Sequence, residues 1–101
     1  MDKKPLSTLI REGAKLRPKA RGVFFERGCS CAMGAAMEAA GVGYDENATR
    51  VMAAGAPILP ELFTSDEKFT ALGEEIYRWN DSHDVEMTRE EIADALEARG
   101  L

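Results

Sequence analysis

The sequence predicts a mainly α-helical protein, with four to five helices packed around a central alanine-rich helix and one short β-hairpin at about residues 22–31. Three observations predict it. Apolar residues recur at spacings of three and four in several segments, which is the period of an amphipathic helix. Aromatic and β-branched residues bracketed by glycines lie before residue 31, and small apolar residues follow it. At 101 residues the chain has the length of one domain, so residues 1–101 are expected to share one core.

The first helix is expected from Leu6 to Leu16, because apolar residues form one stripe there and Pro18 ends it. Segment 22–25 is then expected to pair with segment 29–31 around a Glu-Arg-Gly turn, which gives the hairpin.

The second helix is expected from Ala32 to Ala40, with Glu38 as its one polar residue and Gly41 as its stop. Because this helix is apolar on nearly every side, it should lie at the centre of the fold. Its alanines and Gly34 should let neighbouring backbones approach closely.

Three further elements follow. Asp45 is expected to cap a short helix that Gly55 closes, and Pro57 and Pro60 then interrupt an apolar connector that should lie over the core. The sequence Thr64-Ser65-Asp66-Glu67 has the form of a capping box and predicts the start of a long helix with Phe69, Leu72, Ile76 and Trp79 on one stripe. A second box, Thr88-Arg89-Glu90-Glu91, predicts a last helix that buries Ile92, Ala95 and Leu96 and ends at Gly100.

Composition favours a soluble globular protein, with 45% hydrophobic and 31% charged residues. No secretory signal is recognisable and no apolar stretch approaches the ~20 residues that a membrane helix needs. We therefore expect a cytoplasmic protein without membrane contact. Cys29 and Cys31 are too close in sequence to staple distant parts of the chain, which agrees with a reducing compartment.

The net charge of -5 hides an asymmetry, because residues 1–28 sum to +5 and residues 29–101 to -10. The basic part suggests nucleic-acid binding, for which the candidates are Lys15, Arg17, Lys19, Arg21 and Arg27. The favoured alternative is that the two parts neutralise each other across the fold, since stacking aromatics are absent among the basic residues.

Cys29 and Cys31 are the candidate reactive residues. On a strand their side chains would point to the same face, and Cys31 would stand at a helix N-terminus, where the helix dipole lowers a thiol pKa. The alternative is that both are small apolar residues at a tight junction, and we favour it. A metal site would need these thiols with His83 and Asp81 or Asp84, and this set lacks the paired spacing of zinc ligands, so no metal and no cofactor are expected.

Polar residues gather again at the end of the long helix. A ligand-binding loop would use Trp79 as a stacking wall and Asn80, Asp81 and His83 as polar contacts. The favoured alternative is that Trp79 completes the core and that Asn80 and Asp81 bond to exposed backbone.

Three separated motifs carry a resemblance: Cys31-Ala32-Met33-Gly34-Ala35 after a hairpin, then Trp79-Asn80-Asp81, then Thr88-Arg89-Glu90-Glu91. Over residues 20–40 and 69–99 the chain resembles a family of small bacterial and phage proteins classed as a domain of unknown function. Met33 stands where the family usually has leucine, and the connector 82–87 is longer than usual. The resemblance implies an architecture and no catalytic residues.

The sequence thus predicts a small non-enzymatic interaction or regulatory module with a protein partner or self-association. Two alternatives remain open. One is a thiol-dependent protein that uses Cys29 or Cys31, and the other is a nucleic-acid binder that uses the basic N-terminal third.

Overall fold

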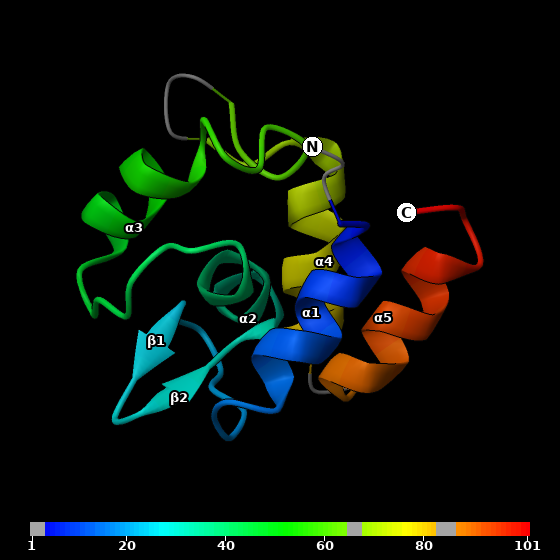
Figure 1. Cartoon of the computed structure of the whole chain (residues 1–101), viewed down its shortest axis with the longest axis horizontal. Helices are drawn as coiled ribbons and strands as arrows, with labels where there is room; N and C mark the ends of the chain where they lie inside the picture. The colour runs from blue at the N-terminus through cyan, green and yellow to red at the C-terminus, as the bar shows by residue number, and fades with distance from the viewer. Residues whose placement is uncertain (1–3, 65–67, 83–86) are drawn as a thin grey trace.

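The computed structural model describes residues 4–64, 68–82 and 87–101. Within these ranges the elements are α1 (Leu6–Ala14), β1 (Phe25–Glu26), β2 (Cys29–Ser30), α2 (Ala32–Ala39), α3 (Ala48–Gly55), α4 (Ala71–Asp81) and α5 (Arg89–Glu97). Figure 1 shows α2 in the middle, with the hairpin and α3 on one side and α1, α4 and α5 on the other. The predicted mainly α-helical fold with a small hairpin is confirmed.

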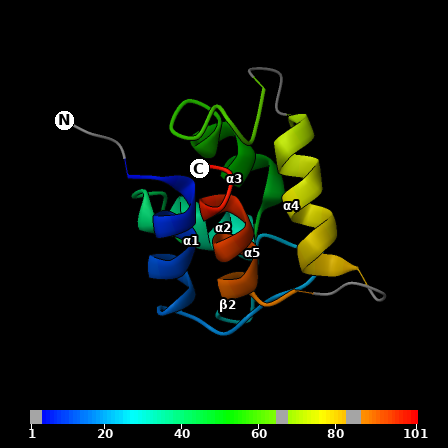
Figure 2. The same ribbon diagram turned by 90° about the vertical axis from the view of Figure 1, so that its right-hand side faces the viewer.

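Helix α2 lies at the centre because small residues let its neighbours approach. A Cβ atom on Gly13 of α1 would lie 1.9 Å from the Ala35 carbonyl oxygen, so only glycine allows α1 to pack this closely. On another side, a Cβ atom on Gly34 would lie 2.3 Å from the Phe24 carbonyl oxygen. Helix α5 lies beside α1 in both ribbon views (Figures 1 and 2). The core therefore surrounds α2, as its apolar sequence predicts.

The hairpin is shorter than predicted and shifted along the chain. Phe25 pairs with Ser30 and Glu26 with Cys29, in place of segment 22–25 with segment 29–31. The turn has positive φ angles at both central residues, 50° at Arg27 and 79° at Gly28, which are those of a type I′ turn. This turn fixes a two-residue connection and hence the register.

The ends of the first three helices also differ from the predictions. Helix α1 ends at Ala14, and Leu16 is 60% exposed instead of continuing the stripe. Helix α2 ends one residue early, at Ala39. Asn47, not Asp45, caps α3, because its side chain accepts from the Arg50 N–H.

Helix α4 begins at Ala71 with Thr70 as its N-cap, so the predicted start at Thr64 is wrong. Phe69 precedes the helix and forms a bridge with Phe63, while residues 65–67 of the expected capping box lie outside the described ranges. The capping box of α5 is confirmed, with Thr88 and Glu91 bonded reciprocally.

The connector between α3 and α4 covers the core as expected. Its buried side chains are Leu59, Leu62 and Phe63, and Ile58 is exposed. The longest described helix has 11 residues, and none in these ranges is long and apolar enough to cross a membrane.

Candidate binding pocket

An apolar cavity of about 260 Å³ lies between the segment that leads into β1, helix α3 and helix α4. The start of α2 contributes Cys31 and Met33 to its wall, and α3 contributes Ala48 and Met52. These four elements come from positions far apart in the sequence. The cavity is thus a product of the tertiary fold and joins the hairpin region to the end of α4.

The thiol of Cys31 belongs to this wall and is held in its protonated form. Cys31 is the N-cap of α2, and its Sγ accepts from the Gly34 N–H at 3.3 Å. Burial raises the pKa of this thiol to about 11 and outweighs the backbone hydrogen bonds, which lower it. The reactive-thiol alternative needs a lowered Cys31 pKa, and here the net shift is upward because the site is desolvated.

Cys29 has different surroundings from Cys31. It lies in β2, is partly buried, and its Sγ lies 3.9 Å from the Arg27 carbonyl oxygen. Strand β2 ends at Ser30, so Cys31 already belongs to the start of α2. The two thiols therefore do not belong to one regular strand.

Asn80 is buried in the wall, and its side chain forms hydrogen bonds within the protein. Its Oδ1 accepts from the Ala32 N–H at 3.1 Å, and its Nδ2 donates to the Ala20 carbonyl oxygen at 3.0 Å. Nδ2 also donates to Asp81 Oδ1 at 2.7 Å. Because both amide hydrogens bond within the chain, Asn80 positions the pocket wall and has no hydrogen left for a ligand.

Aromatic rings form one side of the pocket. Phe24 meets Phe69 edge to face with their centroids 6.1 Å apart, and Phe69 stacks on Tyr77 at 5.8 Å. Tyr77 remains 42% exposed and Val23 41% exposed. The pocket wall therefore includes two large side chains that are exposed.

The structure does not bring the whole predicted ligand loop to this wall. Trp79 is partly buried against the core and is absent from the pocket wall, and the Arg99 guanidinium lies 5.3 Å from the centroid of its ring. His83 lies outside the described residues. Of the three candidates that the structure describes, Asn80 and Asp81 line the pocket and Trp79 does not.

Several basic residues of the N-terminal third bond to acidic or backbone groups. Arg17 Nη2 pairs with Glu38 Oε2 at 2.8 Å, and its guanidinium lies 4.3 Å from the centroid of the Tyr44 ring. Arg11 pairs with Asp94 at 2.6 Å and Glu97 at 2.9 Å. These pairs join the basic part of the chain to its acidic part, as the neutralisation hypothesis expects.

The other nucleic-acid candidates do not share one bonding pattern. Lys19 Nζ donates to the Met87 carbonyl oxygen at 3.0 Å. Lys15, Arg21 and Arg27 are exposed. Arg17 and Lys19 are thus engaged within the fold, while the other three lie at its surface.

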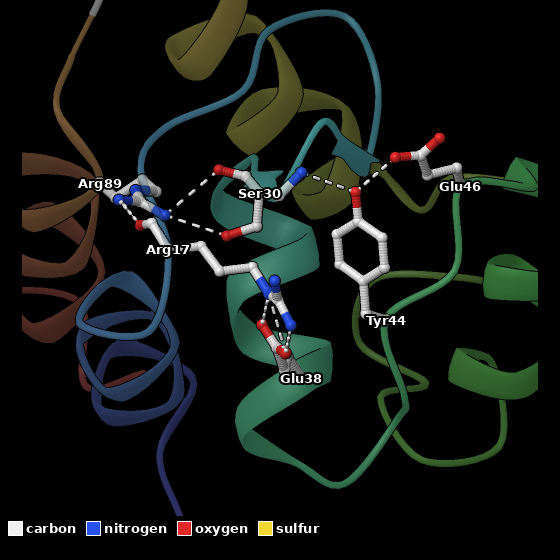
Figure 3. A network of polar contacts seen from close by, with 7 residues as sticks. Arg17, Ser30, Glu38, Tyr44, Glu46 and Arg89 are labelled. Carbon is white, nitrogen blue, oxygen red and sulfur yellow. Dashed lines mark hydrogen bonds and ion pairs between the residues drawn. The ribbon is translucent and has the colours of Figure 1, made fainter.

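The structural roles of Arg89 and Tyr44 are not predicted by any local pattern in the sequence. Arg89 is buried and donates to Ser30 Oγ at 3.0 Å and to the carbonyl oxygens of Ser30, Ala14 and Arg17 at 3.2, 3.2 and 2.7 Å. The Tyr44 hydroxyl accepts from the Gly28 N–H. It also donates to Glu46, as Figure 3 shows. In sequence Arg89 is one charge within a capping box, and nothing local marks it as buried.

The described residues contain no group of three or more His, Cys, Asp or Glu side chains that could hold a metal ion. No protein-family model, curated protein or solved structure matches the chain. The resemblance at residues 20–40 and 69–99 therefore stays a prediction.

Proposed function

We propose that the chain is a small interaction module that binds a partner protein by accepting one of its apolar side chains in the pocket between segment 22–24, α3 and α4. The observation that carries the proposal is a cavity of about 260 Å³ with a mainly apolar wall, which includes the exposed side chains of Val23 and Tyr77. Apolar anchors that fill such pockets dominate the energy of many protein interfaces.

The size of the cavity favours a single side chain over a larger ligand. An apolar cavity of about 150 Å³ holds benzene, whereas pockets for drug-sized ligands start near 300 Å³. At about 260 Å³ the cavity has room for an aromatic ring or a large aliphatic group with its stem.

The wall is held in place before any partner arrives. Asn80 links α4 by hydrogen bonds to the first residue of α2 and to Ala20. The Cys31 Sγ accepts a hydrogen bond from the Gly34 N–H in the first turn of α2. A preformed pocket lowers the entropy lost on binding, because few side chains need to be ordered.

Other observations weigh against Cys31 as a reactive thiol and against two of the five basic candidates as nucleic-acid contacts. Thiol chemistry needs a thiolate, and the pKa of about 11 keeps Cys31 protonated near neutral pH. Nucleic-acid binding needs available cations, and of the five candidates Arg17 is paired with Glu38 and Lys19 bonds to the Met87 carbonyl oxygen. Self-association is disfavoured by a net charge of -5 on each copy.

The test uses small probes of the anchoring side chain. N-acetyl-phenylalaninamide and N-acetyl-serinamide are titrated into the ¹⁵N-labelled protein, and amide shifts are followed by NMR. The phenylalanine probe should bind with a dissociation constant on the order of 1 mM, which corresponds to about 4 kcal/mol. It should shift the signals of Val23, Phe24, Tyr77 and Asn80, and the serine probe should not.

Two variants on α3 provide the matched control. Ala48→Phe places a ring at the pocket wall and should abolish the shifts, whereas Ala54→Phe changes an exposed residue outside this wall and should preserve them. Equal responses to the two probes, or unchanged binding in Ala48→Phe, would contradict the proposed function.

A further inference from the structure

We infer that the partner segment carries a lysine or arginine next to its apolar anchor, and that Asp81 recognises this positive charge. The inference rests on the proposed function of the pocket and names the chemistry of what enters it. The position of the Asp81 carboxylate supports it, because the other described residues of the pocket wall are uncharged.

Asp81 is the last residue of α4, is partly buried, and contributes to the pocket wall. Its Oδ1 accepts from Asn80 Nδ2 at 2.7 Å, and Asn80 is itself fixed by Ala20 and Ala32. This chain of bonds positions the carboxylate. In the described part of the protein, no other hydrogen bond to this carboxylate is found, so Oδ2 can still accept from a ligand.

Among the described residues of the wall, Asp81 is the one that carries a charge. Its neighbours there include the stacked rings of Phe69 and Tyr77. Apolar walls exclude water, which strengthens the attraction between a carboxylate and an incoming cation. The faces of aromatic rings also attract cations. The wall therefore favours an apolar group that is accompanied by a positive charge over one accompanied by a negative charge.

Among the described residues, Lys19 interacts electrostatically with Asp81. Its Nζ donates to the Met87 carbonyl oxygen at 3.0 Å, not to Asp81. Burial lowers the pKa of Lys19 and the charge of Asp81 opposes that shift. Lys19 thus weakens the field of Asp81, but it does not occupy the carboxylate with a direct ion pair.

The test compares N-acetyl-Phe-Lys-amide with N-acetyl-Phe-Glu-amide by the same NMR titration. The wild-type protein should bind the lysine probe about threefold more tightly, the size expected of a partly exposed ion pair. Asp81→Asn keeps the acceptor for Asn80 and should remove the difference. Glu74→Gln removes the same charge from an exposed residue of α4 outside the pocket wall and should keep it.

The outcomes of these titrations distinguish a failure of the inference from a failure of the proposed function. A preference for the lysine probe that is lost only in Asp81→Asn supports the inference. Equal binding of both probes to the wild-type protein overturns it and leaves the proposed function standing, and so does a preference that persists in Asp81→Asn. If neither probe binds, the proposed function fails and the inference fails with it. The wild-type preference should also shrink at 1 M salt, and a preference unchanged there would contradict an ion pair even without the variants.

Discussion

Asn80 of α4 holds the first residue of α2, because its Oδ1 accepts from the Ala32 N–H across 48 positions of sequence. The same side chain donates to the Ala20 carbonyl oxygen, 60 positions away. One buried amide thus joins α4, α2 and the segment before the hairpin. These are three of the parts that meet around the pocket.

Asn80→Ala should lower the free energy of unfolding by about 2–4 kcal/mol, since it leaves buried backbone groups of Ala20 and Ala32 without their partner. Urea unfolding followed by circular dichroism measures it. Asn47→Ala, which removes the exposed cap of α3, should cost about 1 kcal/mol. A loss at Asn80 no larger than the loss at Asn47 would show that the buried amide does not hold the fold together.

Arg89→Lys should destabilise the protein by about 1–3 kcal/mol although it preserves the charge. The planar guanidinium reaches the carbonyl oxygens of Ala14, Arg17 and Ser30 together, and an ammonium cannot match that geometry. Arg78→Lys on the exposed face of α4 should change stability by less than about 0.5 kcal/mol. Thermal unfolding of both variants tests the difference, and equal effects would argue against the role given to Arg89.

Gly13→Ala should lower the free energy of unfolding by about 3 kcal/mol or more, or prevent folding. The reason is that the new Cβ atom would lie 1.9 Å from the Ala35 carbonyl oxygen. Backbone at this distance cannot move aside without separating α1 from α2. Gly43→Ala meets nothing within 4 Å and should be neutral or slightly stabilising. Chemical denaturation of the two variants is the measurement, and a tolerated alanine at position 13 would contradict the close packing of α1 on α2.

Cys31 should make stability depend on alkaline pH. The thiol has a pKa of about 11 when folded, against an ordinary value of 9.0. Between these values the unfolded state binds fewer protons than the folded state. The stabilisation of the folded protein by the neutral Cys31 thiol is therefore complete below about pH 9 and is lost as pH rises towards 11. Over this pH range the free energy of unfolding should fall by about 3 kcal/mol.

The measurement is urea unfolding of the wild-type protein and Cys31→Ala from pH 8 to pH 11. The wild-type protein should lose stability relative to the variant as pH rises. Iodoacetamide at pH 8 should modify Cys31 only after unfolding. Parallel pH curves for the two proteins, or rapid native alkylation of Cys31, would be inconsistent with its burial.

Local signals in the sequence are sufficient for some elements. The capping box at Thr88 and Glu91 needs only residues within one helical turn, and it forms as predicted. The central position of α2 follows from a segment that has no polar face to turn towards water. Both features depend on the chain close to the residues concerned.

The sequence predicts the wrong start for α4 because it offers two possible N-cap residues. Thr64 and Thr70 are both suitable caps, and the structure uses Thr70, which accepts from the Gly73 N–H and donates to the Glu61 carbonyl oxygen. Phe69 packs against Phe63 and Phe24 before the helix starts. This long-range aromatic contact decides the boundary and cannot be read from helical spacing.

The pocket could be predicted only in part. Asn80 and Asp81 were candidate polar contacts and do belong to its wall, but Asn80 serves the fold. Met52 of α3 and Tyr77 of α4 both line the pocket, and neither has a local pattern that indicates a cavity. Sites between elements depend on how the elements pack, which sequence periodicity does not specify.

The most direct test of the account is where the ring of N-acetyl-phenylalaninamide lies when it is bound. Intermolecular nuclear Overhauser effects between its ring protons and methyl groups of the protein should connect it to Val23, in the segment that leads into β1, and to Met52, in α3. Contacts to Leu16 or Ile58 instead, exposed apolar residues outside this pocket wall, would contradict the proposed binding site.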